Sequence, residues 1–288
     1  PEYNGYKVYW NDGGQIVPPE DGGIIAEVSK LDFSEIKFNA NENLIETIGE
    51  KVDTVFIDGC VKNGTIPSIN SRDNIKIVFT SLHGTSIVSI PESLKKAGYT
   101  DVHIVEEQRV PNGDFPTVKS PNPEEPAALK MATDLADKIN ADIVIGTDPD
   151  CDRLGVAVRN LNGEMTLLNG NQTMSVMTNF LIKKWQEEGR INGNQFIGST
   201  IVSTELVDKI TESYDVETKI SLTGVKWRDR MISDYETIEI IGSEEESVGY
   251  MVGEFVRDKD AVTTTLLACE IATISKQNGS SFYEELLN

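Results

Sequence analysis

The chain has 288 residues, 39% of them hydrophobic and 25% charged, which is enough apolar material for one large domain or two ordinary ones. Its formal net charge of -21 repels nucleic acid and anionic membranes, so we expect binding to neither. No apolar run approaches the roughly 20 residues that span a bilayer, and the 3 widely spaced cysteines form neither a disulfide framework nor a zinc motif, which favours a reducing, cytoplasmic location.

The first 38 residues differ in pattern from the rest of the chain. Residues 7–10 (KVYW) form a short β-rich run, and residues 11–14 (NDGG) are typical of a hairpin turn. Prolines and glycines within 18–23 then interrupt regular structure. A chain that opens in the middle of a hairpin is typical of the tail of an earlier domain, so we interpret residues 1–38 as the remnant of a preceding domain.

The pattern of residues 39–160 predicts alternating strands and helices. Short apolar runs predict buried strands at 75–80, 102–105, 142–147 and 154–158. Helices are predicted at about 86–97 and after residues 123–126 (PEEP), where proline and acidic residues suit a first helical turn. Between these helices, residues 106–123 are rich in proline and indicate a long loop.

The second half, residues 161–288, repeats this alternation. Its predicted helices are at about 171–186, 204–213 and 260–277, and its predicted strands are at 196–202, 216–222 and 238–241, the last before an acidic loop. This spacing is typical of parallel sheets with crossover helices. We therefore predict an α/β fold class: two consecutive α/β domains with mostly parallel mixed sheets, at 39–160 and 161–288, divided near the turn at 160–163 (NLNG).

The acidic loop, residues 148–153 (DPDCDR), is the most informative stretch of the sequence. Asp148, Asp150 and Asp152 occupy alternate positions directly after a buried-type strand. In an extended loop, this spacing can direct three oxygen ligands at one centre. Hard oxygen ligands suit Mg²⁺, which keeps open positions for phosphate and water. The carboxyl end of a parallel strand is also where ligands bind in such sheets.

Other interpretations of the acidic loop lead to different functions. An EF-hand needs glycine at its sixth position and glutamate at its twelfth, where this chain has Arg153 and Arg159, so we exclude a calcium loop of that type. A haloacid-dehalogenase-like phosphatase has a shorter Asp-x-Asp-x-Thr/Val pattern, which Asp152 in the last position disfavours without excluding. The remaining alternative is a solvated acidic turn that binds nothing.

The acidic loop resembles the Asp-Pro-Asp-x-Asp-Arg metal loop of the α-D-phosphohexomutase superfamily, which includes phosphoglucomutase, phosphomannomutase and phosphopentomutase. Other segments resemble motifs of this superfamily in the same order along the chain. They are residues 1–15, similar to the segment after its catalytic serine, 82–85 (LHGT), 114–123 (DFPTVKSPNP), 223–227 (TGVKW), 244–250 (EEESVGY) and 257–261 (RDKDA). The resemblance covers nearly the whole chain and implies that it consists of the central domains of such an enzyme.

The resemblance implies a set of catalytic and metal-binding residues. Asp148, Asp150 and Asp152 would bind Mg²⁺, with the phosphate of a phosphoserine as a fourth ligand. Arg153 would hold a phosphate oxygen through its planar donor fork, or would pair only with the neighbouring aspartates. Lys259 would transfer the proton of the sugar hydroxyl.

The resemblance also implies where the sugar binds. Glu245 and Ser247 would form hydrogen bonds with sugar hydroxyls. Further sugar-binding candidates, on a turn after an apolar strand, are Thr223, Gly224 and Lys226. The alternatives without function are a solvated acidic bend and a solvated lysine. Glu244 departs from the phenylalanine or glycine that the superfamily usually has at that position.

Two motifs of the superfamily are absent from the chain. One is Thr-Ala-Ser-His-Asn-Pro, which carries the catalytic serine, so residues 1–38 would be the remnant of the catalytic-serine domain; the other is the phosphate-binding Arg-x-Ser-Gly-Thr-Glu loop. The expected partners are a phosphorylated sugar and the missing N- and C-terminal domains of the same protein. We expect this chain alone to be inactive.

The whole enzyme would move a phosphoryl group between C1 and C6 of a hexose phosphate, or C5 of a pentose. The reaction would pass through a phosphoserine and a bisphosphosugar, with Mg²⁺ as cofactor and glucose 1,6-bisphosphate as activator. Two other functions stay open. One is a non-catalytic module that binds metal and phosphosugar, and the other is the haloacid-dehalogenase-like phosphatase, whose phosphate release would depend on Asp148.

Overall fold

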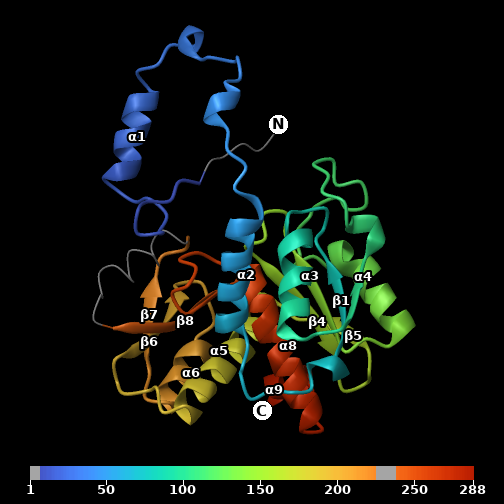
Figure 1. The fold of residues 1–288 in the computed structure, drawn as a ribbon. Helices are drawn as coiled ribbons and strands as arrows, with labels where there is room; N and C mark the ends of the chain where they lie inside the picture. Colours follow the sequence, from blue (N-terminus) through green and yellow to red (C-terminus); the bar gives the residue numbers. More distant parts are fainter. Residues whose placement is uncertain (1–6, 225–237) are drawn as a thin grey trace.

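The structure is a computed structural model that describes residues 7–224 and 238–288, and its described strands form two sheets (Figure 1). The first sheet has the order β2-β1-β3-β4-β5, and the second has the order β7-β6-β8-β9. The strands of the first sheet are β1 (Lys76–Thr80), β2 (Asp101–Ile104), β3 (Ile143–Thr147), β4 (Leu154–Arg159) and β5 (Met165–Leu167). Those of the second sheet are β6 (Gln195–Thr200), β7 (Glu217–Ser221), β8 (Glu239–Glu245) and β9 (Gly249–Val252).

The two sheets share one pattern of strand pairing. In each, the first strand pairs in parallel with two neighbours, β1 with β2 and β3, and β6 with β7 and β8. The next strand, β4 or β9, then returns antiparallel. The prediction of two α/β units with mixed sheets is therefore confirmed. The antiparallel pairs arise because a short connection between two apolar runs permits a hairpin, whereas a parallel return needs a long crossover.

Helices cover both faces of the first sheet. α4 (Pro126–Ile139) packs on the face that presents Val78 and Val144, whereas α3 (Ser86–Ala97) packs with Ile77 and Phe79. Alternate residues of β1 thus enter two different cores, as the two-residue period of a strand requires. The other α-helices among the described residues of the main body are α2 (Gly49–Gly64), α5 (Gly170–Glu187), α6 (Leu206–Ser213), α8 (Ala261–Gln277) and α9 (Phe282–Leu287).

The helix α8 lies at the junction of the two sheets (Figure 1). Asp260 caps its N-terminus by accepting the backbone N–H groups of Val262 and Thr263. The helix is buried along nearly its whole length and contacts α2, α3, β3 and β4 as well as β9. It therefore helps to close the core of the first sheet, although it follows all four strands of the second sheet in the chain. The division at 39–160 and 161–288 stays a prediction.

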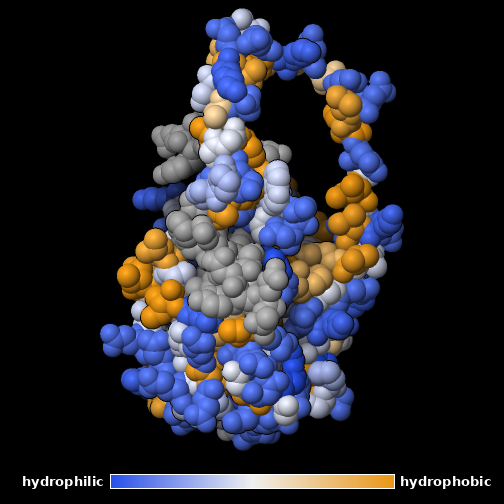
Figure 2. Space-filling model, turned by 90° about the vertical axis from the view of Figure 1, so that its left-hand side faces the viewer, coloured by the Kyte–Doolittle hydropathy of each residue, from blue (hydrophilic) through white to orange (hydrophobic). Residues whose placement is uncertain are grey.

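Residues 16–48 extend away from this body as an arm (Figure 1). The arm contains α1 (Glu20–Val28), none of whose residues is buried. Apolar side chains are exposed along the arm, orange in Figure 2, and include Ile25, Leu31, Phe33, Phe38 and Leu44. Within the described residues these side chains have no cover, so the arm contributes little to the core. That residues 1–38 are the remnant of a preceding domain stays a prediction.

Candidate active site

The acidic loop between β3 and β4 gathers three carboxylates. Asp148, Asp150 and Asp152 each offer one oxygen, and these oxygens lie within 4.8 Å of one another. The bend is fixed by Asp148 Oδ1, which accepts the backbone N–H of Asp152 at 3.1 Å and that of Arg153 at 3.0 Å. Cys151 has a φ of 64°, a left-handed conformation that reverses the chain at this point. Asp148 and Asp152 are nearly buried, whereas Asp150 is exposed.

The turn after β1, which contains the matched residues 82–85, is packed against the acidic loop. Thr85 donates to the carbonyl oxygen of Pro149 from both its backbone N–H and its hydroxyl, each at 2.9 Å. A Cβ on Gly84 would lie 2.5 Å from Pro149 Cα, so a glycine is needed for this approach. This turn therefore supports the acidic loop. The close contact explains why a glycine and a threonine occupy these two positions.

Two lysines from opposite ends of the chain form ion pairs with the acidic loop. Lys7 Nζ lies 3.2 Å from Asp150 Oδ2 and 2.9 Å from Asp152 Oδ2. Lys259 Nζ lies 3.2 Å from Asp152 Oδ2. Burial opposes the charge of Asp152, but Lys259 and Lys7 together hold its pKa below the ordinary value. Burial, with the negative charge of Asp152, raises the pKa of Asp148 to about 8. Asp148 is therefore short of positive charge in the folded chain.

This donor set fits a hard divalent cation. Three carboxylate oxygens near one another match the preference of Mg²⁺ for oxygen ligands. A cation at this position would also supply the positive charge that Asp148 lacks. Among the His, Cys, Asp and Glu side chains of the described ranges, this is the one group of three with such geometry.

The hairpin of β8 and β9 brings the second predicted motif beside the acidic loop. Glu245 is the last residue of β8, and Ser247 lies half-buried in the turn that follows, residues 246–248. We call these three residues the β8–β9 turn. The backbone N–H of Leu154, at the start of β4, donates to the carbonyl oxygen of Val248 at 2.9 Å. A main-chain bond therefore joins the loop of the first sheet to the loop of the second.

Lys259 links the same two loops through its side chain. Its Nζ lies 3.2 Å from Asp152 Oδ2 and 3.9 Å from Glu245 Oε2, and its side chain is 9% exposed. Both carboxylates are also nearly buried, so this interaction is screened little by solvent. The candidate proton-transfer group, a candidate metal ligand and a candidate sugar ligand are thus neighbours.

Arg153 is at the site, and its guanidinium lies near the acidic loop itself. Nε lies 3.9 Å from Asp148 Oδ2 and 3.8 Å from Asp152 Oδ1, with about a third of the side chain exposed. Its backbone forms an isolated antiparallel bridge with Gly249 of β9. At these distances the pairing is loose, and the exposed donor fork can turn towards a ligand.

The third group of predicted site residues, on the turn after β7, lies farther from the acidic loop in the strand order. Thr223 and Gly224 follow β7, which is separated from β8 by β6 in the strand order. The parallel strands β6, β7 and β8 end at one edge, so this turn lies on the same side of the sheet as Glu245. Neither residue forms a hydrogen bond with the acidic loop or the β8–β9 turn among the described residues. Lys226 lies outside the described residues.

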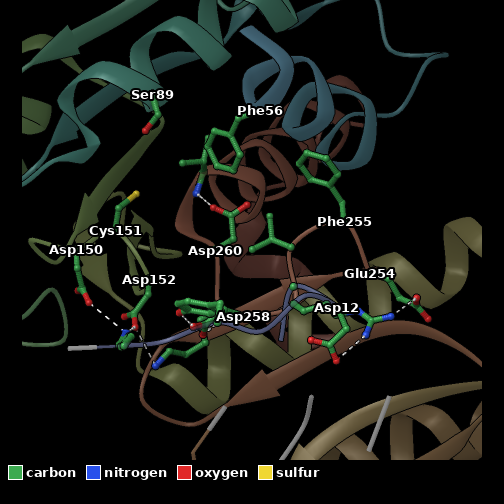
Figure 3. Close-up of a pocket in the computed structure, with 17 residues that line it drawn as sticks. Asp12, Phe56, Ser89, Asp150, Cys151, Asp152, Glu254, Phe255, Asp258 and Asp260 are labelled. Carbon is green, nitrogen blue, oxygen red and sulfur yellow. Dashed lines mark hydrogen bonds and ion pairs between the residues drawn. The ribbon is translucent and has the colours of Figure 1, made fainter. Parts of the chain in front are cut away.

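Residues 8–16 form an N-terminal hairpin, closed by an antiparallel bridge between Tyr9 and Gln15. This hairpin and Lys7 beside it line the site, which the sequence alone did not indicate. The hydroxyl of Tyr9 donates a hydrogen bond to Asp258. Asp12 Oδ2 lies 3.8 Å from Arg257 Nη1. These residues border a pocket of about 670 Å³ (Figure 3). The pocket also contacts Phe56, Asp150, Asp152, Phe255 and Lys259.

Comparison with known proteins identifies the family of this chain. Residues 54–163 match the family model described as phosphoglucomutase/phosphomannomutase, alpha/beta/alpha domain II, and residues 169–288 match domain III of the same family. Together the matches place this α/β chain in the α-D-phosphohexomutase superfamily. The chain belongs to the phosphoglucomutase/phosphomannomutase family.

The relatives are longer than this chain. A phosphoglucomutase of Staphylococcus aureus is 35% identical over 297 residues, which cover 99% of this chain and 51% of that protein. The chain thus spans about half the length of the curated relatives it matches. None of the described helices combines the length and the apolar composition that crossing a membrane requires.

Solved structures share the fold at low sequence identity. A putative phosphomannomutase from Thermus thermophilus has a TM-score of 0.63 and 17% identity, over 82% of this chain and 49% of that one. An N-acetylphosphoglucosamine mutase of Aspergillus fumigatus, in complex with GlcNAc-6P and magnesium, has a TM-score of 0.55 and 14% identity, over 81% of this chain and 51% of that one. These likenesses concern the fold.

Proposed function

We propose that this chain is the central part of a phosphohexomutase that moves a phosphoryl group between C1 and C6 of a sugar phosphate, or C5 of a pentose. The observation that carries the proposal is the position of Lys259, whose Nζ lies 3.2 Å from Asp152 and 3.9 Å from Glu245. Phosphoryl transfer needs a positively charged group that contacts the phosphoryl oxygens, close to the reacting hydroxyl. A carboxylate loop suited to a cation adjoins a carboxylate suited to hydroxyls, which supports this chemistry.

In this proposal the acidic loop binds the phosphoryl group. Asp148, Asp150 and Asp152 hold Mg²⁺, which when bound would withdraw negative charge from the phosphoryl oxygens. Arg153 turns from the aspartates to a phosphate oxygen, for which its planar donor fork is suited. Lys7 occupies the acidic loop when no cation is bound, because its ammonium lies against Asp150 and Asp152, and a bound cation displaces it.

The hairpin of β8 and β9 receives the sugar. The carboxylate of Glu245 accepts hydrogen bonds from sugar hydroxyls, and Ser247 can both donate and accept. The further proposed contacts, from the turn after β7, are Thr223, Gly224 and Lys226. Lys259 exchanges a proton with the reacting hydroxyl, since its ammonium contacts the sugar-binding carboxylate and the acidic loop.

Other parts of the same protein complete the site in this proposal. A phosphoserine donates and accepts the phosphoryl group, a further domain binds the second phosphate of the bisphosphosugar, and glucose 1,6-bisphosphate acts as activator. The 288-residue chain alone is therefore inactive. Its share of about half the length of its relatives supports this interpretation.

The test is the conversion of glucose 1-phosphate to glucose 6-phosphate in a coupled assay with Mg²⁺ and glucose 1,6-bisphosphate. The full-length protein should turn over, and the 288-residue chain should not. In the full-length protein, Asp150→Asn should lower the rate by roughly 100-fold or more, because it removes a metal ligand. Asp134→Asn is the matched control, since Asp134 on α4 is 63% exposed and Asp150 61%.

Three results would point elsewhere. Turnover by the 288-residue chain that depends on Asp150 would contradict the proposed need for a serine outside it. Release of phosphate from glucose 1-phosphate, abolished by Asp148→Asn, would indicate the haloacid-dehalogenase-like phosphatase. Binding of Mg²⁺ and glucose 1-phosphate with no turnover in the full-length protein would indicate a non-catalytic binding module.

A further inference from the structure

The β8–β9 turn rests on two elements that contain no predicted sugar ligand. One is the start of α5, where a Cβ on Gly170 would overlap the carbonyl oxygen of Glu246. The other is the end of β6, where the hydroxyl of Ser199 donates to Glu244 and Thr200 Oγ1 donates to Glu246 Oε2 at 3.3 Å. The residues held in this way are the chain neighbours of Glu245.

The contact of Ser199 determines which way Glu245 faces. Successive side chains of a strand point to opposite faces of the sheet. Glu244 is fully buried and takes the hydrogen bond of Ser199, whereas Glu245 Oε2 lies towards Lys259 Nζ. A bond that fixes the rotation of β8 at Glu244 therefore fixes the direction of the next side chain.

The contact of Gly170 determines how deep the β8–β9 turn lies. Gly170 is the first residue of α5, and it meets backbone atoms of Glu246 rather than the end of a flexible side chain. Backbone cannot yield here without moving the whole turn, because the N–H of Leu154 bonds the carbonyl oxygen of Val248. Any side chain at 170 would have to displace the β8–β9 turn.

We propose that Gly170 and Ser199 are positioning residues, which set the place and direction of Glu245 without touching the sugar themselves. The inference rests on the proposed function for the sugar-binding role of Glu245. The position of the β8–β9 turn can be measured independently of any sugar, so the two ideas can fail separately.

Gly170→Ala gives a sharp test because it should stabilise α5 as an isolated helix but disturb the packing of α5 against the β8–β9 turn. Gly170 has no left-handed φ, and alanine is the better helix former, so the substitution should favour α5 itself. The capping box of Asn169 and Gln172 is unaffected by it. In the folded chain, however, the new Cβ must push the β8–β9 turn away.

The experiment compares Gly170→Ala and Ser199→Ala with two matched controls. Gly22→Ala adds a Cβ on α1 that meets nothing within 4 Å. Ser93→Ala removes a buried hydroxyl that has no hydrogen-bond partner among the described residues. Amide hydrogen exchange of residues 245–250 and the Kd values of Mg²⁺ and of glucose 1-phosphate are measured by mass spectrometry and calorimetry.

Both test variants should exchange the amides of 245–250 about two- to tenfold faster and weaken glucose 1-phosphate binding by roughly tenfold. The Kd for Mg²⁺ should stay at the wild-type value in both test variants, and both control variants should behave like the wild type. A general loss of stability would instead weaken Mg²⁺ binding as well. If Gly170→Ala does not fold, Ser199→Ala carries the test alone.

Unchanged exchange in both variants would overturn the positioning role. Faster exchange with an equal loss of Mg²⁺ binding would overturn it too, because the effect would then extend beyond the β8–β9 turn. Faster exchange in a protein that binds no glucose 1-phosphate would support the positioning role and sink the sugar-binding proposal instead.

Discussion

Gly84 is the residue at which the acidic loop meets its support most closely. A Cβ there would lie 2.5 Å from Pro149 Cα and 2.8 Å from the carbonyl oxygen of Pro149. The same carbonyl accepts two hydrogen bonds from Thr85, so neither side of the contact can move freely. The geometry of the three aspartates therefore depends on a residue outside the acidic loop.

Gly84→Ala should lower the free energy of unfolding by about 1–3 kcal/mol and weaken Mg²⁺ binding, because the added methyl group overpacks the contact with Pro149. Urea denaturation and calorimetric titration with Mg²⁺ measure the two effects. Gly113→Ala is the control, since its Cβ would meet nothing within 4 Å. Equal effects of the two substitutions would contradict the prediction.

Asp148 should make stability depend on pH when no metal is present. Its pKa rises from the ordinary 3.8 to about 8 in the folded chain, so the folded state holds a proton that the unfolded state releases between these values. Stability should therefore fall as the pH rises through this window. In EDTA, the wild type should lose roughly 1–3 kcal/mol more than Asp148→Asn between about pH 5 and pH 8.

Chemical denaturation at several pH values measures this difference. Mg²⁺ should reduce the loss in the wild type, because a bound cation favours the ionised carboxylate. Parallel pH profiles of the wild type and Asp148→Asn in EDTA would show that Asp148 is ordinarily ionised in the folded chain.

At the residue scale, local patterns could be predicted and distant contacts could not. Asp148, Asp150 and Asp152 lie in one short loop, so their spacing alone indicates that they converge. Lys7 contacts the same loop although it precedes Asp150 by 143 residues in the chain, and no neighbouring residue singles it out. Only the position of the N-terminal hairpin beside the acidic loop brings Lys7 there.

The hairpin elements explain why the two loops of the site meet. The sequence predicts a strand at 238–241 and then an acidic loop, whereas β8 continues to Glu245. Pairing with β6 and β9, and the hydrogen bond between Glu244 and Ser199, outweigh the polar composition of this stretch. The longer strand carries Glu245 up to the acidic loop.

Apolar runs were enough to predict most strands and helices, because each run is bounded by turn residues. They were not enough to predict that β4 and β9 return antiparallel, since an apolar run does not encode direction. Nor could they indicate that a main-chain bond would join the start of β4 to the β8–β9 turn. That contact depends on the packing of one unit against the other.

The N-terminal hairpin should compete with metal for the acidic loop. Lys7 Nζ bonds Asp150 and Asp152, and a cation bound there would have to displace it. Because Lys7 is 46% exposed, the pair contributes little, and Lys7→Met should tighten Mg²⁺ binding by about two- to fivefold. Calorimetric titration measures this, with Lys209→Met on the far α6 as control. Weaker binding by Lys7→Met would mean that Lys7 assists the metal.

The two units are joined at the scale of the whole molecule by a buried ion pair. Glu270 of α8 is fully buried and accepts from Arg72 Nε at 2.6 Å and from the hydroxyl of Tyr99 at 2.6 Å. It also accepts the backbone N–H of Ile66 at 2.8 Å. All three partners precede the second unit in the chain, so α8 is anchored in the first unit.

Glu270→Gln should lower the free energy of unfolding by about 3 kcal/mol, because it leaves the guanidinium of Arg72 without its buried partner. Fluorescence and far-UV circular dichroism in urea should report one coincident transition, shifted to lower denaturant. Glu92→Gln, at an exposed pair with Lys95 on α3, should change stability by less than about 0.5 kcal/mol. Two separate transitions would contradict the shared role of α8.

The sequence predicts two units but not the sharing of a helix between them. The apolar character of 260–277 indicates a buried helix, and the pattern is the same whichever sheet buries it. Glu270 is the one clue, since a glutamate within such a run needs a partner. Arg72 could not be recognised as that partner because it lies on a loop far along the chain.

The position of α8 limits which segments of this protein can be exchanged between genes by recombination. A recombination event that moved residues 49–160 into another gene would leave behind α8, which contacts α2, α3, β3 and β4. The transplanted unit would then expose the apolar side chains that α8 covers, and we expect it to aggregate. An exchange that keeps the first sheet covered would have to carry the span up to Gln277, so we expect the two sheets to be inherited together.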